Sequence, residues 1–243
     1  MKGKAAVHIG CSGWDYKHWK GCFYPEGCPS GEWFEKYAGI FSTVEINNTF
    51  YRLPSVSTFK KWRDMAPEGF IYAVKASRFI THMKKLKDAG GAMRQFLDRA
   101  GALGNRLGPI LIQLPPHWRV NAERLDGFTD ELPAGFRYVF EFRDSSWYAE
   151  DVYGILSGKD MSLCLHDMKG SELPETAIGP LSYIRFHGTA GSYGGKYPED
   201  ILDKKARFIK KMRGEGREVY AYFNNDAEAN APSDALRLIR KVS

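Results

Sequence analysis

The chain has 243 residues, of which 43% are hydrophobic and 26% are charged. This composition is typical of a globular protein with a large core and argues against a disordered or fibrous one. No stretch is long and apolar enough to span a membrane, and Met1–Val7 is too short and polar for a signal peptide. The net charge of +6 admits polyanionic partners without requiring them. Four cysteines without zinc-binding spacing indicate reduced thiols, so we expect a cytoplasmic protein.

Eight short hydrophobic runs carry polar or charged residues at alternate positions. They are His8–Ser12, Val44–Asn47, Ile71–Ser77, Ile110–Leu114, Val139–Arg143, Leu163–His166, Tyr183–His187 and Val219–Asn224. Successive side chains of a strand point to opposite sides, so Glu45 would share a face with Asn47, and Glu141 with Arg143. The same alternation places Cys164 on the apolar side of its run. We predict eight strands whose polar faces meet on one axis.

The segments between these runs mostly have helical periodicity. Apolar residues recur at helical spacing from Met93 to Leu107 and again over Glu199–Arg213, and Ser233 is a plausible N-cap for a helix over Asp234–Val242. Met168–Pro180 contains a proline and little periodicity, so the helix there is weak or missing. About 250 residues is usual for an eight-fold β/α barrel. We therefore predict an α/β fold, a single TIM-like (β/α)8 barrel domain over residues 1–243.

Several stretches resemble one known family, in order and nearly end to end. They are Gly10–Trp19, Glu45–Tyr51, Lys75–His82, Leu114–Pro116, Glu141–Trp147, Arg185–Gly188 and Tyr222–Asp226. The chain resembles the YecE-like family, also called domain of unknown function 72. This resemblance implies a TIM-like barrel but no particular reaction, because the family has no established activity. Family members often carry a carboxylate near His166–Asp167, and the sequence leaves open which of these two residues points inward.

Working groups of β/α barrels lie at the carboxyl ends of the strands and in the loops that follow. We predict that Glu45, Glu141 and His187 are catalytic. Either glutamate would be the general base, and His187 would be the general acid because the ordinary pKa of histidine is near neutrality. The predicted substrate-binding residues are Trp14, Asn47, Tyr51, Lys75, Arg143, Arg185, Lys196, Tyr222, Asn224, Asn225 and Asp226.

The cations of this set favour an anionic ligand. Lysine supplies a point charge, and arginine offers a planar fork that suits phosphate or carboxylate. The glycine-rich segment from His187 to Tyr197 could help to hold phosphate, with Lys196 assisting. Trp14 and Tyr51 are candidates for stacking on a base or a sugar ring. The alternative is a closed ion network without a site, for example Glu45 paired with Lys75 and Glu141 with Arg143 or Arg185.

The sequence therefore predicts a cation-rich pocket that binds or acts on a phosphate-bearing ligand, with nucleic acid among the candidates. Such an enzyme would be a hydrolase or a lyase. One alternative is a metal-dependent hydrolase resembling endonuclease IV-like barrels, in which His166, Asp167 and His187 would be the metal ligands. The other is a nucleic-acid-binding module without chemistry. No cofactor is firmly implied, no membrane partner is expected, and the oligomeric state stays open.

Overall fold

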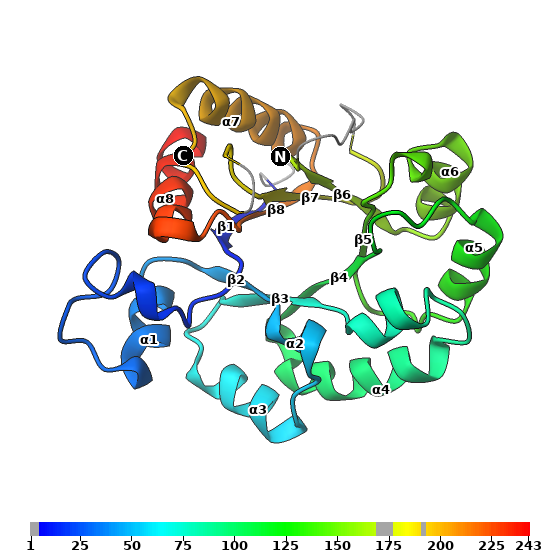
Figure 1. Cartoon of the computed structure of the whole chain (residues 1–243), viewed down its shortest axis with the longest axis horizontal. Helices are drawn as coiled ribbons and strands as arrows, with labels where there is room; N and C mark the ends of the chain where they lie inside the picture. The colour runs from blue at the N-terminus through cyan, green and yellow to red at the C-terminus, as the bar shows by residue number, and fades with distance from the viewer. Residues whose placement is uncertain (1–4, 169–176, 191–192) are drawn as a thin grey trace.

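The computed structural model describes residues 5–168, 177–190 and 193–243. Eight parallel strands form a closed barrel in which each strand pairs with its sequence neighbours and β1 pairs with β8. The strands are β1 (Val7–Cys11), β2 (Thr43–Ile46), β3 (Ile71–Lys75), β4 (Leu107–Gln113), β5 (Tyr138–Glu141), β6 (Ser162–His166), β7 (Leu181–Phe186) and β8 (Glu218–Phe223). Helices surround the strands (Figure 1). The predicted fold class is confirmed.

Eight α-helices lie in the described part of the chain: α1 (Trp33–Ala38), α2 (Asn48–Tyr51), α3 (Val56–Met65), α4 (Gly90–Ala100), α5 (Ala122–Asp130), α6 (Glu150–Gly158), α7 (Glu199–Gly214) and α8 (Asn230–Val242). Short 3-10 helices are η1 (Lys17–Trp19), η2 (Ser30–Glu32), η4 (Gly101–Arg106), η5 (Ser145–Trp147) and η6 (Ala227–Ala229), and η3 (Phe79–Met83) is a π-helix. Most of the segment predicted to have a weak or missing helix, residues 169–176, lies outside the described residues.

Two helix ends differ from the prediction. The helix predicted from Met93 to Leu107 ends earlier: α4 stops at Ala100, and in the following η4 the φ of 59° at Gly104 keeps the chain from continuing as a helix to β4. The predicted N-cap at Ser233 is wrong, since α8 begins at Asn230 after a left-handed Ala229. Pro232 is tolerated there because the first turn of a helix needs no intrahelical N–H partner.

The barrel interior is filled by alternate residues of the strands. A buried cluster of small, aliphatic and tyrosine side chains consists of Ala73, Leu111, Val139, Cys164, Leu181, Tyr183, Tyr220 and Tyr222. Cys164 therefore points into the barrel, with its Sγ 3.9 Å from Glu141 Oε2, and its predicted outward orientation is wrong. Charged and polar side chains follow this cluster toward the carboxyl ends of the strands, so the interior is a packed core capped by a polar layer.

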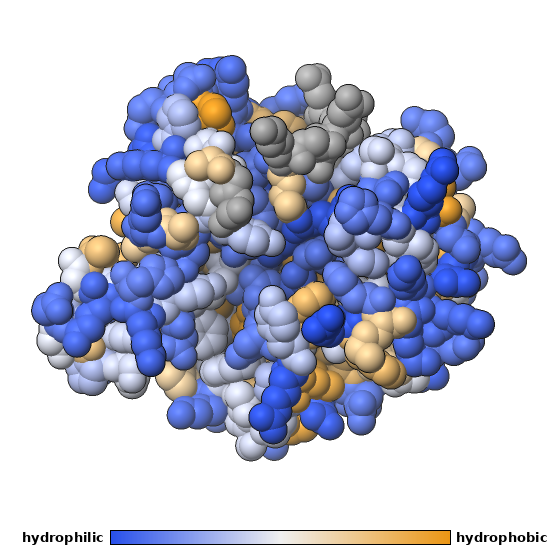
Figure 2. Space-filling view, in the orientation of Figure 1, coloured by the Kyte–Doolittle hydropathy of each residue, from blue (hydrophilic) through white to orange (hydrophobic). Residues whose placement is uncertain are grey.

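The remaining apolar strand residues pack outward against the helices in one large core. The molecular face in Figure 2 is mostly hydrophilic, with hydrophobic residues gathering near α2 and toward α4. Over the described ranges, no helix has the length and apolar character needed to cross a membrane.

Candidate functional site

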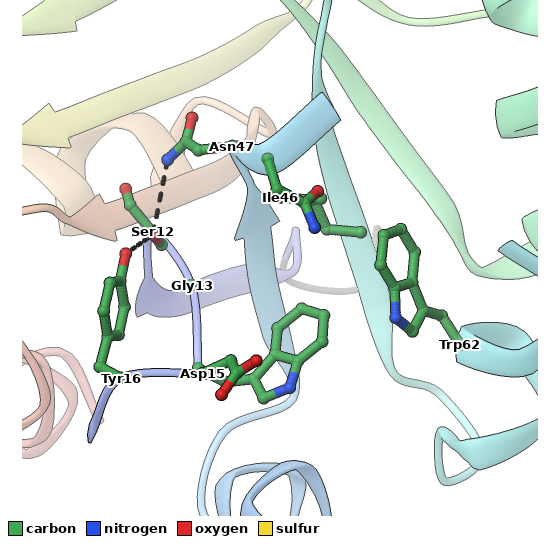
Figure 3. Close-up of a pocket in the computed structure, with 9 residues that line it drawn as sticks. Ser12, Gly13, Asp15, Tyr16, Ile46, Asn47 and Trp62 are labelled. Atoms are coloured by element: carbon green, nitrogen blue, oxygen red, sulfur yellow. Dashed lines mark hydrogen bonds between the residues drawn. The ribbon is translucent and has the colours of Figure 1, made fainter. Parts of the chain in front are cut away.

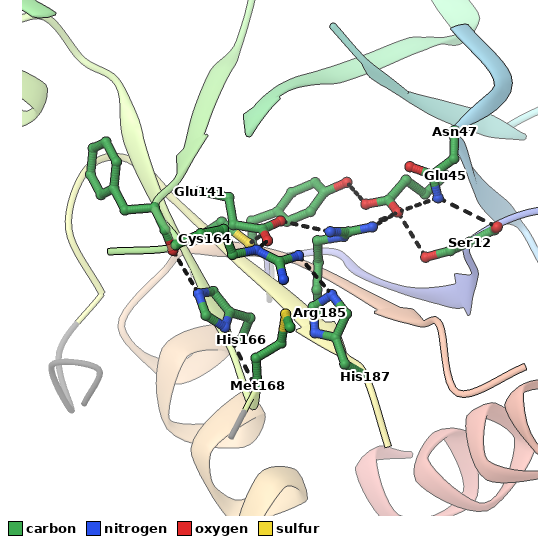
Figure 4. A network of polar contacts seen from close by, with 12 residues as sticks. Ser12, Glu45, Asn47, Glu141, Cys164, His166, Met168, Arg185 and His187 are labelled. Atoms are coloured by element: carbon green, nitrogen blue, oxygen red, sulfur yellow. Dashed lines mark hydrogen bonds and ion pairs between the residues drawn. The ribbon is translucent and has the colours of Figure 1, made fainter. Parts of the chain in front are cut away.

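A buried ion network lies at the carboxyl ends of the strands. Arg185 on β7 donates from Nη1 to Glu141 Oε2 on β5 at 2.7 Å, and from Nη2 and Nε to Glu45 Oε1 on β2 at 2.9 and 3.1 Å. All three side chains are at most 1% exposed. One guanidinium therefore joins two carboxylates from well-separated strands across the barrel axis (Figure 4). We call these three residues, together with Arg143, the central ion network.

Both carboxylates of this network have further donors. Glu45 accepts hydrogen bonds from Ser12 Oγ at 2.7 Å, Tyr183 OH at 2.7 Å and Asn47 Nδ2 at 3.0 Å. Glu141 accepts from Arg143 Nε, which lies two residues further along the chain. Tyr183 was not predicted as a site residue, although the alternation that turns Arg185 inward also turns inward the residue two positions before it.

The electrostatics keep both glutamates ionised. Burial alone would raise the pKa of each carboxyl group, but Arg185 holds the pKa of Glu45 below its ordinary value, and Arg143 and Arg185 hold that of Glu141 well below it. A carboxylate with a depressed pKa and its oxygens already bonded to cations is a weak base. The predicted general-base role of Glu45 or Glu141 is therefore not supported by this geometry.

His187 has polar groups on both sides of its ring, and of its ring nitrogens only Nε2 is hydrogen-bonded among the described residues. Arg143 Nη2 lies 3.1 Å from His187 Nε2, and because guanidinium can only donate, Nε2 is the acceptor and Nδ1 carries the proton. Nδ1 faces Asp167 Oδ1 at 3.7 Å, and the same carboxylate accepts from the His187 backbone N–H and from Tyr197 OH. Burial lowers the pKa of His187 to about 4, although Asp167 raises it. His187 is thus neutral at pH 7, and its general-acid role, which started from the near-neutral pKa of an ordinary histidine, stays a prediction.

Among the described residues, Lys75 on β3 is the cation of the polar layer that no carboxylate pairs with. It is 8% exposed, and within the described part of the chain it forms no ion pair. Its Nζ lies 4.3 Å from the centroid of the Phe50 ring. Burial, followed by the positive charge of Arg185, lowers the pKa of Lys75 to about 7, against smaller opposing effects of Glu141 and Glu45. The predicted pair of Glu45 with Lys75 is wrong, since Glu45 binds Arg185 instead.

Lys75 opens into a cavity of about 230 Å³, which we call the mouth cavity. Its lining consists of Tyr16, Asn47, Tyr51, Lys75, Gln113, Arg185, Tyr193 and Asn224. Five of these residues were predicted to bind substrate: Asn47, Tyr51, Lys75, Arg185 and Asn224. The tyrosines at 16 and 193 follow strands in sequence, and this position is the signal that could have identified them.

Other predicted residues lie elsewhere. Tyr222 is buried below the mouth, where its hydroxyl lies 2.6 Å from Thr43 Oγ1. Asn225 is fully buried and donates to Asp234 Oδ2 at 2.8 Å. Asp226 accepts from Trp19 Nε1 at 2.5 Å and lies 2.8 Å from a ring nitrogen of His18, so it holds the loop after β1. These three side chains support the barrel and do not line the mouth cavity.

Two further predicted residues lie at the edge of the site. Lys196 is exposed on the loop after β7 and lines neither the mouth cavity nor the neighbouring cavity beside it. Trp14 lines that neighbouring cavity, which lies between the loop after β1 and helix α3. Trp62 on α3 forms its far wall (Figure 3). Trp62 is not among the predicted residues because it belongs to helix α3, whereas the predicted site residues lie at strand ends and in the loops that follow them.

The candidate metal ligands do not converge. Across residues 5–168, 177–190 and 193–243 there is no group of three or more His, Cys, Asp or Glu side chains placed to hold an ion. The rings of His166 and His187 lie perpendicular with centroids 5.8 Å apart, and His166 Nε2 lies 2.9 Å from the carbonyl oxygen of Phe142. Of the pair left open by the sequence, His166 is the inward residue of β6, in register with Arg185, and Asp167 instead holds the backbone of His187.

The closed parallel barrel, with its polar layer and mouth cavity at the carboxyl ends of the strands, defines a TIM-like barrel protein whose candidate site is at the usual end of that fold. The chain belongs to the family described as "Protein of unknown function DUF72", which matches residues 8–243. The resemblance found in the sequence is thereby confirmed.

Known relatives cover almost the whole chain. It is 22% identical over 267 residues to UPF0759 protein YunF of Bacillus subtilis, spanning 96% of this chain and 93% of that protein. Among solved structures it is similar to the DUF72 family protein TM1631 of Thermotoga maritima, with a TM-score of 0.88, 26% identity and coverage of 97% and 98% of the two chains. EF0366 of Enterococcus faecalis superposes with a TM-score of 0.82 at 17% identity over 97% and 95%. At that identity the likeness concerns the fold alone.

Proposed function

We propose that the protein binds a small phosphate-bearing molecule in the mouth cavity, with Lys75 as the cation that meets the phosphate. The observation that carries this proposal is the charge balance of the polar layer. Arg143 and Arg185 are matched by the buried carboxylates Glu45 and Glu141, whereas Lys75 has no carboxylate partner in the described structure. A buried ammonium without a counter-ion is unfavourable, and an anionic ligand would supply one.

The surrounding groups suit a phosphate held by one lysine. The amide side chains of Asn47, Gln113 and Asn224 line the same cavity and can donate hydrogen bonds to oxygen. Arg185 also reaches the wall of the mouth cavity, but its donors are directed to Glu45 and Glu141. Its positive charge would therefore attract a phosphate more than its N–H groups would bind it directly. Lysine is a common point-charge ligand for phosphate.

If the bound molecule is a substrate, Lys75 is the group best placed to move a proton. A general acid or base works best when its pKa lies near the operating pH, and the pKa of Lys75 is about 7. This assignment gives Lys75 the proton-transfer role that the sequence predicts for Glu45 or Glu141 as base and for His187 as acid. The reaction class we propose is hydrolysis or elimination on a phosphate-bearing substrate, with the central ion network holding the site rigid.

Titration calorimetry with inorganic phosphate at pH 6.5 tests the binding proposal. Lys75→Met removes the charge and keeps much of the side-chain length, and Lys210→Met makes the same change on the exposed face of α7. We expect Lys75→Met to weaken phosphate binding at least tenfold, which corresponds to a loss of ~1.4 kcal/mol of binding free energy. Lys210→Met should leave the affinity within about twofold of the wild type. Equal affinity of the wild type and Lys75→Met, or no binding by the wild type at millimolar phosphate, would refute the proposal.

A further inference from the structure

A second cavity adjoins the mouth cavity, and we call it the side cavity. Its volume is about 280 Å³, and its lining includes Trp14, Asp15, Tyr16, Asn47, Asn48 and Trp62. Tyr16 and Asn47 line both cavities. In Figure 3 these two residues stand at one end of the side cavity and Trp62 stands at the other. The two spaces are therefore neighbours that share a wall.

The side cavity offers aromatic faces fixed in position. The rings of Trp14 and Trp62 are nearly perpendicular, at 88°, with centroids 5.8 Å apart, and Trp14 also packs edge-on against Phe34 at 5.2 Å. Both indoles are partly exposed. They form an apolar corner in which a flat ring can stack on one indole while its edge meets the other.

Polar groups also line the side cavity. Asn47 and Asn48 contribute amides and Asp15 a carboxylate. Asn47 donates from Nδ2 to Glu45, but its Oδ1 is buried and accepts no hydrogen bond from the described residues. An unmet acceptor beside the junction of the two cavities is unfavourable unless a ligand or solvent donor satisfies it.

We propose that the two cavities hold one ligand, a nucleotide, with its phosphate at Lys75 and its base in the corner formed by Trp14 and Trp62. The phosphate half of this inference rests on the proposed function, whereas the base half rests on the side cavity alone. Small-molecule sites usually measure ~300–1,000 Å³, and each cavity alone falls just below that range whereas the two joined fall within it.

A base fits this lining better than a sugar ring does. A base presents two apolar faces and confines its hydrogen-bonding groups to its edge, which matches an aromatic corner bordered by amides. A sugar ring carries hydroxyl groups around its whole circumference. Several of them would face Trp14, Trp62 and Ile46 without a hydrogen-bonding partner.

The test compares AMP, UMP, adenosine, ribose 5-phosphate and inorganic phosphate by calorimetry and by quenching of tryptophan fluorescence at pH 6.5. We expect AMP or UMP to bind at least tenfold more tightly than ribose 5-phosphate. Trp62→Leu should remove this advantage without changing the affinity for phosphate, and Trp62→Phe should retain part of it. Asn48→Ala should weaken nucleotide binding severalfold, whereas Asn105→Ala, an exposed change in η4 just before β4, should not.

The outcomes separate the two proposals. Equal affinities for AMP, UMP and ribose 5-phosphate, unchanged by Trp62→Leu, would overturn the base site while leaving phosphate binding at Lys75 intact. Tighter binding of ribose 5-phosphate than of either nucleotide would also overturn it in favour of a sugar. Conversely, binding of adenosine that depends on Trp62, in a protein that does not bind phosphate, would support the base site and refute the proposed function. Lys75→Met should weaken AMP but not adenosine.

Discussion

Replacing Glu141 by Gln tests whether the central ion network holds the barrel together. Glu141 is fully buried and is the shared acceptor for Arg143 Nε and for Arg185 Nη1 at 2.7 Å. Glutamine keeps the shape but removes the charge. It also replaces one acceptor oxygen with an NH2 group, which would face guanidinium donors that cannot accept a hydrogen bond.

The expected loss of stability can be worked out from these contacts. Removing one partner of a buried ion pair costs about 3–5 kcal/mol. We take the lower end, about 3 kcal/mol, because Arg185 keeps both of its hydrogen bonds to Glu45 and Arg143 is 8% exposed. For a chain of this length, 1 kcal/mol lowers the melting temperature by roughly 2–4 °C, so Glu141→Gln should melt about 6–12 °C below the wild type.

The sign of the pH dependence follows from the depressed pKa of Glu141. This carboxyl stabilises the folded state above its ordinary pKa near 4.5, and the stabilisation is lost as the pH falls through the lower folded-state value. The difference in melting temperature between the wild type and Glu141→Gln should therefore be largest near pH 7 and should become smaller in acid. Thermal unfolding followed by circular dichroism at pH 7 and in acid measures this difference. The control is Glu35→Gln on the exposed face of α1, whose stability should stay within about 0.5 kcal/mol of the wild type. A Glu141→Gln melting temperature equal to that of the wild type at pH 7 would show that the network is dispensable.

Three further predictions concern the mouth and the loops around it. The affinity for sulfate, whose charge is constant from pH 6 to 9, should fall above the pKa of Lys75 of about 7, by up to roughly tenfold per pH unit. Besides burial, the charged groups that affect this pKa are Arg185, Glu141, Glu45 and Arg143. An affinity that does not change from pH 6 to 9 would exclude Lys75 from the anion site. Gly188→Ala should destabilise the folded protein by about 2 kcal/mol or more, because the φ of Gly188 is +97° and a Cβ there would lie 2.1 Å from the Gly194 carbonyl oxygen. The control Gly91→Ala, in open space on α4, should be neutral or stabilising by about 0.5–1 kcal/mol. Urea unfolding of the two variants measures the difference. Tyr222→Phe should lower the stability of the fold by about 1 kcal/mol, because it loses the 2.6 Å hydrogen bond to Thr43. The affinity for phosphate should stay within about twofold of the wild type. A larger loss of affinity would show that Tyr222 does belong to the binding site.

The strands and their inward faces could be predicted because a strand has a two-residue period. Once a run such as Val139–Arg143 is aligned by its hydrophobic side, each polar residue has only one side left to face. Glu45, Lys75, Glu141 and Arg185 therefore reach the same end of the barrel in the structure as in the prediction. The same rule would have excluded Asn225, because it follows the inward Asn224 by one residue.

The two-residue period does not predict which charged side chains pair with each other, or how deep in the barrel each side chain lies. Arg185 on β7 reaches Glu45 on β2 across the barrel axis, so the bond depends on closure and on the length of the side chain. Arginine also has five donors in a rigid fork against the single point charge of lysine, which favours Arg185 over Lys75 as the ligand of two carboxylates. Tyr222 and Asn224 share a face but lie one layer apart, and only the packed interior separates a support residue from a lining residue.

The layered interior explains why chemistry would be confined to one end of the barrel. At the amino ends of the strands, His8 and Arg137 bind Glu218 at 2.9 and 2.7 Å, and tyrosines fill the layer above them. Over the described residues, the polar layer therefore meets an open cavity at the carboxyl ends, where the mouth cavity lies. There Arg143 and Arg185 are held by carboxylates before any ligand arrives, so binding need not order them, and the cost of ordering is one of the main penalties of association. Lys75 differs from both arginines because its charge is unmatched in the described structure, and an arriving anion would gain most of its new electrostatic stabilisation from that one residue.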